Sequence, residues 1–439
     1  MKRFANVTGP IPGPRSRELV AREAAHLAPG IQTISTLAGI AVDGGEGALL
    51  RDADGNTYLD FFAGIGVASI GHGHPALAAA LAQQAARFSS TSFTSEPRVR
   101  LVERIAAVTS RIGSGALHRT QLYSGGAEAV ESALRLARAH TKKHEVVAFT
   151  GAFHGKTGGV LGLMGSDWKN GLEPFLPGQY LAPYPDAQLG PCAERRVGCN
   201  DTRACLAALD QLLRTKTRGE LAAIVVEPMQ GTAGNLIPPR DFLPALREAA
   251  HARGALLIAD EMITGWGRTG RMFAVEHSPV EPDILVFGKG VAGGYPVSGL
   301  TTTDEIARAE PWSRPSFSSS SYGGSPLACA AADAVTRVIV DERLDQHAAQ
   351  VGEVLLAALQ RLAGKHARLS GVRGQGLLLG FDLALDRPGC ERLFHECLRR
   401  GLIVMAYTPR VRINPPLVIS EAQALEGVAI LDEALEATR

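Results

Sequence analysis

Lys289 is the residue whose type and surroundings most clearly suit covalent chemistry. It lies between Gly288 and Gly290, directly after an apolar, strand-like run at residues 284–287. A lysine at the end of a buried strand is easily desolvated, which lowers the pKa of its amine and makes the amine a nucleophile toward a carbonyl carbon. The two glycines leave room beside the side chain. We therefore expect Lys289 to form an imine with a carbonyl compound.

A nucleotide-binding loop is the main alternative for these glycines, and the sequence argues against it. Residues 288–293 and 265–270 each match the pattern GxGxxG. That fingerprint requires a helix to begin inside the loop, so that the helix N-terminus meets the pyrophosphate. Pro296 and a strand-like stretch follow the first match instead. A Walker A loop is also excluded, because Asp283 stands where its first glycine should be. We expect no nicotinamide or nucleotide cofactor.

Asp260 and Glu261 are carboxylates at the end of a second apolar, strand-like run, residues 255–260. Burial of a carboxylate without a partner is costly. An ion pair or a helix cap would supply that partner. A bound cation, such as a protonated pyridine nitrogen, would supply it equally well.

Ser124, Gly125 and Gly126 form a candidate phosphate site, because they join the strand-like residues 120–123 to a strongly helical segment. Ser124 is a good N-cap, and the glycines let backbone N–H groups approach an anion at the positive end of the helix. A plain strand–helix turn would look the same. Together with a buried acid and a strand-end lysine, however, an anion site completes what pyridoxal phosphate requires.

These residues all follow strands of one expected sheet. The alternation of apolar strands with amphipathic helices predicts an α/β fold whose mostly parallel sheet is covered by helices on both faces. Ligands of such sheets bind at the carboxyl ends of the strands. The expected strands are residues 120–123, 145–150, 222–227, 255–260 and 284–287, and the expected helices between them include 127–140 and 241–253.

The chain ends are expected to form a second, smaller α+β domain. Residues 47–60 predict a hairpin that turns at Asp54, Gly55 and Asn56. One long helix is expected near residues 336–363, followed by an α+β region from residue 371 onward. The predicted domains are therefore residues 1–65 and 336–439, which form the small domain, and residues 66–335, which form the large one.

Composition sets limits on partners. The chain has 439 residues, with 45 basic against 44 acidic side chains, so nothing in its charge favours nucleic acid or an acidic membrane surface. No apolar run is long enough to span a bilayer, and a cytoplasmic location is expected. Cys192, Cys199 and Cys205 lack the close pairing of a structural zinc site, so no metal is expected.

Ordered motifs along the chain give it a clear resemblance to a known family. They are "DADGNTYLDFFAGIGVASIGHGHP", "SGGAEAVESALRLAR", "AFHGKT", "VVEPMQG", "ADEMITGWGRTG", "PDILVFGKGVAGGYP", "SYGGSPLACA" and "VRINPPL". With these motifs, spread over about residues 30–435, the chain resembles the class III (ω-amino acid) aminotransferases, which are pyridoxal-phosphate enzymes of fold type I.

The resemblance implies a role for each matching residue. Lys289 matches the imine-forming lysine and Asp260 the partner of the pyridine nitrogen. Phe153 and Met262 match the residues on the two faces of the cofactor ring. Ser321 stands where the family usually has a threonine that reaches the phosphate of the neighbouring subunit, which implies a homodimer with shared sites. The remaining cofactor-binding positions implied are Ser124, Gly125, Gly126, Ala127, His154, Glu227 and Ser320.

Substrate-binding positions show where this chain departs from the family. Arg412 matches the arginine that binds the substrate carboxylate, although on its own it would read as a surface ion pair. Thr232 replaces a glutamate that usually pairs with that arginine. Lys156 stands where 4-aminobutyrate and ornithine aminotransferases carry an arginine, and Ile65 matches the aliphatic residue of the 4-aminobutyrate enzymes. Ile263 replaces a common glutamine.

The activity implied is transfer of an amino group from an amino acid or ω-amine donor to a 2-oxo acid, pyruvate or 2-oxoglutarate. Thr232 keeps a second reading open, because some of the racemases, decarboxylases and lyases of the same family also lose the second glutamate. A non-catalytic relative is a third reading. The intact Lys289 and Asp260 argue against it.

Overall fold

The computed structural model describes residues 3–186 and 201–438. These divide into two compact units. One contains Met1–Ala78, Gly267–Gly270 and Val338–Arg439, and the other contains Ala79–Trp266 and Arg271–Arg337. The exact boundaries predicted for the smaller domain, which is built from both chain ends, stay predictions. The two units are described in turn.

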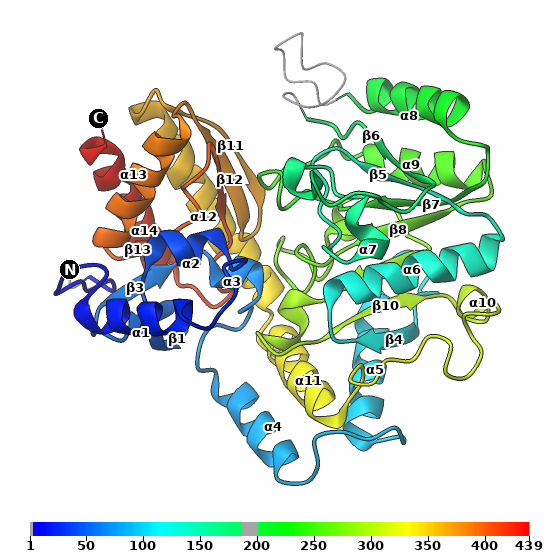
Figure 1. The fold of residues 1–439 in the computed structure, drawn as a ribbon, viewed down its shortest axis with the longest axis horizontal. Coiled ribbons are helices and arrows are strands. Elements are labelled where there is room, and N and C mark those ends of the chain that lie inside the picture. Colours follow the sequence, from blue (N-terminus) through cyan, green and yellow to red (C-terminus); the bar gives the residue numbers. More distant parts are fainter. Residues whose placement is uncertain (1–2, 187–200, 439) are drawn as a thin grey trace. The chain divides into compact units, whose positions relative to one another are not determined.

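A seven-stranded sheet forms the centre of the larger unit (Figure 1). Its order is β4-β10-β9-β8-β7-β5-β6, and the pairs from β9 through β6 are parallel. Only β10 runs against its neighbours β4 and β9. The predicted α/β fold with a mostly parallel sheet is thus confirmed. The strands are β4 (Arg119–Tyr123), β5 (Glu145–Phe149), β6 (Gln179–Ala182), β7 (Leu221–Val226), β8 (Leu256–Asp260), β9 (Ile284–Phe287) and β10 (Ser298–Thr302).

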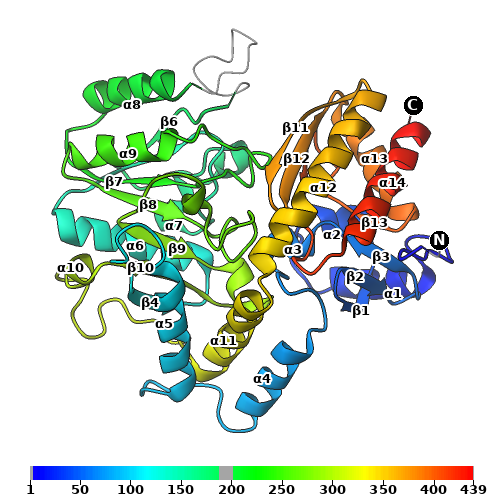
Figure 2. The ribbon, with the colours of Figure 1, turned by 180° about the vertical axis from the view of Figure 1, so that it is seen from behind.

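Helices join and cover these strands (Figure 2). Both predicted helices form, as α6 (Gly126–Thr141) and α9 (Phe242–His251). The others are α5 (Glu96–Thr109), α7 (Gly158–Leu161), α8 (Thr202–Lys216), α10 (Asp304–Ala307) and α11 (Pro326–Asp341), with 3-10 turns η1 (Asp167–Lys169), η3 (Ala274–His277) and η4 (Lys289–Ala292). Helix α4 (Pro75–Ala85) includes residues of both units.

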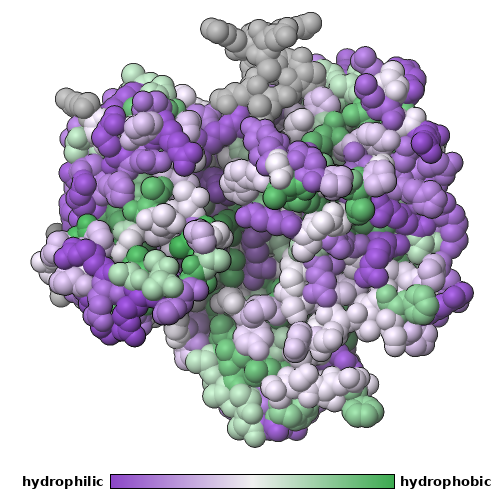
Figure 3. Space-filling view, viewed as in Figure 1, coloured by the Kyte–Doolittle hydropathy of each residue, from purple (hydrophilic) through white to green (hydrophobic). Residues whose placement is uncertain are grey.

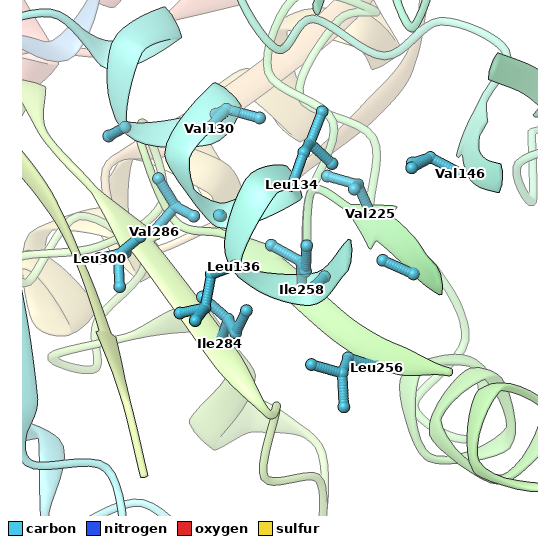
Figure 4. Packing of buried hydrophobic residues seen from close by; sticks show 14 of the residues in the cluster. Val130, Leu134, Leu136, Val146, Val225, Leu256, Ile258, Ile284, Val286 and Leu300 are labelled. Carbon is cyan, nitrogen blue, oxygen red and sulfur yellow. The ribbon is translucent and has the colours of Figure 1, made fainter. Parts of the chain in front are cut away.

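The core of this unit lies between α6 and the sheet (Figure 4). Val130 and Leu134 on α6 point toward strand residues such as Val225 and Ile258, and all four are at most 1% exposed. The strand residues between those that face α6 are buried as well, so both faces of the sheet are covered. Each such side chain contributes about 1.5–3 kcal/mol through burial. This core fixes the strand ends rigidly.

The smaller unit contains two sheets, ordered β1-β2-β3-β13 and β11-β12-β14. The predicted hairpin is present, and the Asp52 carboxylate closes its turn by accepting from the N–H groups of Asp54 and Asn56. The strands are β1 (Val42–Glu46), β2 (Leu49–Asp52), β3 (Thr57–Asp60), β11 (Leu369–Gln375), β12 (Leu378–Leu383), β13 (Leu402–Ile403) and β14 (Arg410–Ile413). The helices are α1 (Pro14–Ala24), α2 (Thr33–Ala38), α3 (Ala63–Gly66), α12 (Leu344–Lys365), α13 (Arg387–Arg399) and α14 (Glu421–Ala437).

The single long helix expected near residues 336–363 is wrong. Helix α11 ends at Asp341 and α12 begins at Leu344. Arg343 between them has a left-handed backbone with φ of 52°, which breaks the run of helical hydrogen bonds. Nothing in the local sequence predicts a break, since neither glycine nor proline is present there. Within the described part of the chain, no helix is long and apolar enough to cross a membrane.

Candidate active site

The predicted site residues of the larger unit lie on turns that follow the sheet strands. Asp260 ends β8 and is paired in register with Val286 on β9. Lys289 follows Val286 by three residues, so the acid and the lysine leave the same edge of the sheet from neighbouring parallel strands. The turn after β5 carries Phe153, and Glu227 follows β7. The sheet thus brings four separate segments to one edge.

Asp260 is a buried acid with one partner from a distant turn and one from its own turn. It is 2% exposed, its Oδ2 lies 2.8 Å from Nδ1 of His154, and its Oδ1 accepts from the N–H of Met262 at 3.0 Å. Burial lowers the pKa of His154, but the hydrogen bond and charge of Asp260 and the charge of Glu227 outweigh it, so that this pKa is raised overall. The Asp260 carboxylate has further lone pairs that can accept from an additional donor.

Lys289 has an unusual backbone conformation. Its φ is 42°, a left-handed conformation uncommon for residues other than glycine. A Cβ at Gly288 would lie 2.2 Å from Sδ of Met262, so a larger residue there would require the Met262 side chain to move. Such strained positions cluster at functional sites. The same methionine contacts Gly126, where a Cβ would lie 3.0 Å from its Sδ. Met262 thus ties the lysine turn to the start of α6.

The start of α6 can receive an anion, although the predicted cap is wrong. The N-cap residue is Gly125, not Ser124. Glu128 takes the place of a capping side chain, because its Oε2 accepts from the N–H groups of Ser124 and Gly125. Among the described residues, none accepts from the N–H groups of Gly126 or Ala127. These two donors stand at the positive end of a 16-residue helix.

The turn after β5 is held against this helix start. Gly155 has φ of 125°, and a Cβ there would lie 2.4 Å from Cβ of Ala127. This close approach places Phe153 and Lys156, which flank the turn, beside the candidate anion site. The Phe153 ring meets Trp168 edge to face, with ring centroids 6.1 Å apart, and the Lys156 ammonium lies 5.2 Å from the Trp168 ring.

Glu227 links two of these turns. Its Oε1 accepts from the N–H of Phe153 at 2.9 Å, and its Oε2 accepts from the N–H of Gly231 at 3.0 Å. Burial raises the pKa of Glu227 to about 7, against the lowering effect of His154. Thr232 follows Gly231 and is half-buried. Glu227 therefore positions both the aromatic turn and the turn that carries Thr232.

The raised pKa of Glu227 predicts that stability falls as pH rises. The folded state binds this proton more tightly than the unfolded state, in which the carboxyl has its ordinary pKa of 4.5. The stabilisation is complete below that value and is lost as pH rises through about 7, on the order of 3 kcal/mol in all. Glu227→Gln should therefore show a flatter melting temperature between pH 5 and 8 than the wild type. The exposed Glu248→Gln is the matched control, and parallel curves for all three proteins would contradict the assignment.

Two predicted substrate residues belong to the smaller unit. Ile65 lies in a run of four left-handed residues, Ala63 to Gly66, with φ of 66° at Ile65 itself. A β-branched residue in this conformation is strained. The Asp60 carboxylate supports the turn by accepting from the N–H of Ala63 at 2.8 Å. Arg412 is half-buried on β14, opposite Gly380 of β12. Their roles toward substrate stay predictions.

Ser320 and Ser321 lie on an irregular segment before α11. Ser320 Oγ accepts from the N–H of Gly323, while Ser321 is exposed. Of the cysteines considered for a metal, Cys192 and Cys199 lie outside the described residues. Cys205 is buried in α8, and burial raises the pKa of its thiol to about 12.

The sequence reasoning missed three contributors to the site. Glu128 and Ser298 shape the start of α6, the latter by donating from its hydroxyl to the Gly125 carbonyl at 2.8 Å. A glutamate three residues after a glycine cap was the available signal for the first. Trp168 gave no signal, because its contact with Lys156 depends on how the intervening loop folds.

The residues present fit pyridoxal phosphate. The helix start offers unpaired N–H donors for a phosphate, Asp260 has acceptor capacity for a ring nitrogen, and Lys289 supplies an amine. The thioether of Met262 lies close to both Gly126 and Gly288, so the helix start and the turn that carries Lys289 lie near each other. What the site can do chemically is therefore to hold a charged aromatic ring and place a lysine amine beside it.

Comparisons with known proteins agree with this geometry. A family model described as aminotransferase class-III matches residues 33–435. The chain is 35% identical to a 5-aminovalerate aminotransferase of Pseudomonas aeruginosa over 90% of this chain and 93% of the relative. It is 34% identical to a 4-aminobutyrate aminotransferase of Mycobacterium tuberculosis over 96% of both. A solved ω-transaminase from Thermomicrobium roseum, described as (S)-enantioselective, matches with a TM-score of 0.86 and 32% identity over 96% of this chain and 98% of that one.

Proposed function

We propose that this chain, which belongs to the class III aminotransferase family, uses pyridoxal phosphate held by Lys289 and Asp260 to transfer amino groups from unbranched ω-amino acids to a 2-oxo acid. Members of this family are pyridoxal-phosphate enzymes. The observation that carries the proposal is the buried Asp260–His154 pair, joined through Met262 to the lysine turn and to the start of α6.

Each of these residues has a part in the proposed reaction. The bound cofactor supplies an electron-accepting ring next to the substrate carbon that carries the amine. Asp260 accepts a hydrogen bond from the ring nitrogen, and its negative charge keeps the proton there. The N–H groups of Gly126 and Ala127 bind the phosphate. The Nζ of Lys289 would hold the cofactor, and as a neutral amine it could take the proton from the substrate carbon as a general base.

The proposed donor class follows from where positive charge lies. Lys156 is at the aromatic turn, and by the family resemblance Arg412 matches the arginine that binds the substrate carboxylate. A donor with an amine at one end and a carboxylate at the other could pair with a cation while its amine reaches Lys289. The relatives named for 5-aminovalerate and 4-aminobutyrate act on donors of this kind. The family's aminotransferase relatives also favour transfer over the racemase and lyase alternatives.

A half-reaction tests this function. The holoenzyme is mixed with 4-aminobutyrate or 5-aminovalerate alone, and the oxo product is quantified. We expect about one equivalent per site and no more until 2-oxoglutarate or pyruvate is added. Continuous turnover without an acceptor would instead identify a lyase with these achiral donors, or a racemase with a chiral amino acid. Absence of any product with every unbranched ω-amino acid would reject the donor class.

We also propose that the enzyme is a homodimer. Helix α4 has the sequence PALAAALAQQA, yet of its residues only Gln84 is buried. Phe88 and Phe93 in the loop after it are 39% and 83% exposed. Hydrophobic residues gather at the bottom of the face in Figure 3, where Figure 1 places α4. An apolar surface of this kind is typical of a protein interface.

Phe93→Asp is expected to weaken this dimer. Because the Phe93 side chain is 83% exposed, its replacement costs the folded chain little, but a buried charge at an interface is costly. Sedimentation velocity at low micromolar concentration should show a dimer for the wild type and a larger monomer fraction for the variant. Trp168→Phe, on a different surface, should stay dimeric. A monomeric and fully active wild type would contradict the proposal.

A further inference from the structure

Three side chains form a cation–aromatic cluster, defined here as Phe153, Lys156 and Trp168. The Lys156 Nζ lies 5.2 Å from the Trp168 ring and 6.0 Å from the Phe153 ring. The two rings meet edge to face at 79°. This is the distance range of cation–π attraction. The ammonium therefore lies beside both aromatic rings.

Trp168 is anchored, even though its side chain is 57% exposed. It lies in η1, between Asp167 and Lys169. The Lys169 ammonium donates to the Gly162 carbonyl and lies 5.5 Å from the Phe175 ring. Asp167 accepts from the Asn170 side chain. The neighbours of Trp168 thus have their own partners, and the indole is left to Lys156 and Phe153.

The charge of Lys156 is open to a ligand. No ion pair joins it to a carboxylate among the described residues, and Asp167, the acid nearest to Trp168 in sequence, bonds to Asn170 instead. An ammonium held at an aromatic face keeps N–H donors that point away from the ring. A lysine lacks the planar fork with which an arginine fixes a carboxylate. Here the aromatic rings supply the orientation that the side chain lacks.

The cluster lies beside the proposed reaction site. Phe153 directly precedes His154, the partner of Asp260, and its N–H is fixed by Glu227. Gly155 packs against Ala127 at the anion site. A substrate whose amine reaches Lys289 would have this cluster as one wall of its binding site.

We propose that Trp168 is a specificity-determining residue, which orients the Lys156 ammonium to receive a carboxylate at the far end of the substrate. The inference rests on the proposed function and deepens it, because it concerns the second carboxylate of 2-oxoglutarate and the carboxylate of ω-amino acid donors. Trp168 acts through Lys156 and is a positioning residue. It has no part in proton transfer.

The test compares two acceptors that differ only at the far end. 2-Oxoglutarate carries a second carboxylate, and pyruvate does not. Trp168→Leu should raise the KM for 2-oxoglutarate about two- to fivefold and leave its kcat and the KM for pyruvate unchanged. Trp168→Phe keeps an aromatic face, so its KM for 2-oxoglutarate should stay close to that of the wild type. Leu172→Ala, an exposed apolar residue of the same segment, is the matched control.

Lys156→Met provides the decisive background. In that variant, Trp168→Leu should cause no further change, because the ammonium that it orients is gone. If an acceptor is not used, the inhibition constants of glutarate and butyrate give the same comparison. Equal effects of Trp168→Leu on both members of a pair, or additive effects of the two substitutions, would overturn the inference. Failure of the wild type to transfer amino groups would instead reject the proposed function.

Discussion

Lys289→Ala should lower kcat by at least about 10³-fold with every donor and acceptor pair, because the same amine attaches the cofactor and moves the proton. The loss should be specific to function. Alanine keeps the Cβ of lysine and meets the same backbone conformation, with φ of 42°, that Lys289 already adopts. The melting temperature of the variant without cofactor should therefore stay close to that of the wild type.

Steady-state kinetics with a saturating donor is the measurement. Lys216→Ala, at an exposed position of α8, controls for the loss of one lysine. Added methylamine should replace part of the lost amine, and this rescue would support the proton-transfer role. Turnover within tenfold of the wild type in Lys289→Ala would show that another group does this work.

Asp260→Asn carries the second largest expected effect. Asparagine has the shape of aspartate but no charge, so it cannot keep a proton on a ring nitrogen. We expect kcat to fall about 10²- to 10³-fold, in the range found when a preorganised electrostatic partner is removed. Covalent attachment should persist, since the substitution leaves Lys289 itself unchanged.

His154→Gln tests how much the positive charge of His154 contributes, apart from the negative charge of Asp260. Glutamine can still donate to Asp260 but carries no positive charge, so a smaller loss of kcat is expected than in Asp260→Asn. The two kcat values are measured with one donor and one acceptor at fixed pH. An Asp260→Asn variant that turns over at the wild-type rate would show that this carboxylate is only structural.

Much of the site could be predicted from sequence because strand ends carry strong local signals. Apolar runs end at Asp260 and just before Lys289, and parallel strands bring their carboxyl ends to one edge. Glycine at residue 288 indicates a close approach to the backbone, and in the structure the Met262 side chain makes this approach. Such features are encoded within a few residues of the chain.

Three features of the structure were not predicted. The cap of α6 is Gly125 and not Ser124, because the Glu128 carboxylate satisfies the first N–H groups; this glutamate was a local signal that the prediction overlooked. The break at Arg343 has no glycine or proline to mark it. Trp168 contacts Lys156 across a segment of eleven residues, and no periodicity of the sequence indicates that contact.

Reduction of the holoenzyme with borohydride shows directly whether Lys289 attaches pyridoxal phosphate. The holoenzyme is reduced with borohydride, digested and analysed by peptide mass spectrometry. We expect one modified peptide that contains Lys289. Its mass should include that of the reduced cofactor, and its fragment series should place the added mass on that lysine. Modification of a different lysine, or a holoenzyme with no reducible attachment, would contradict it.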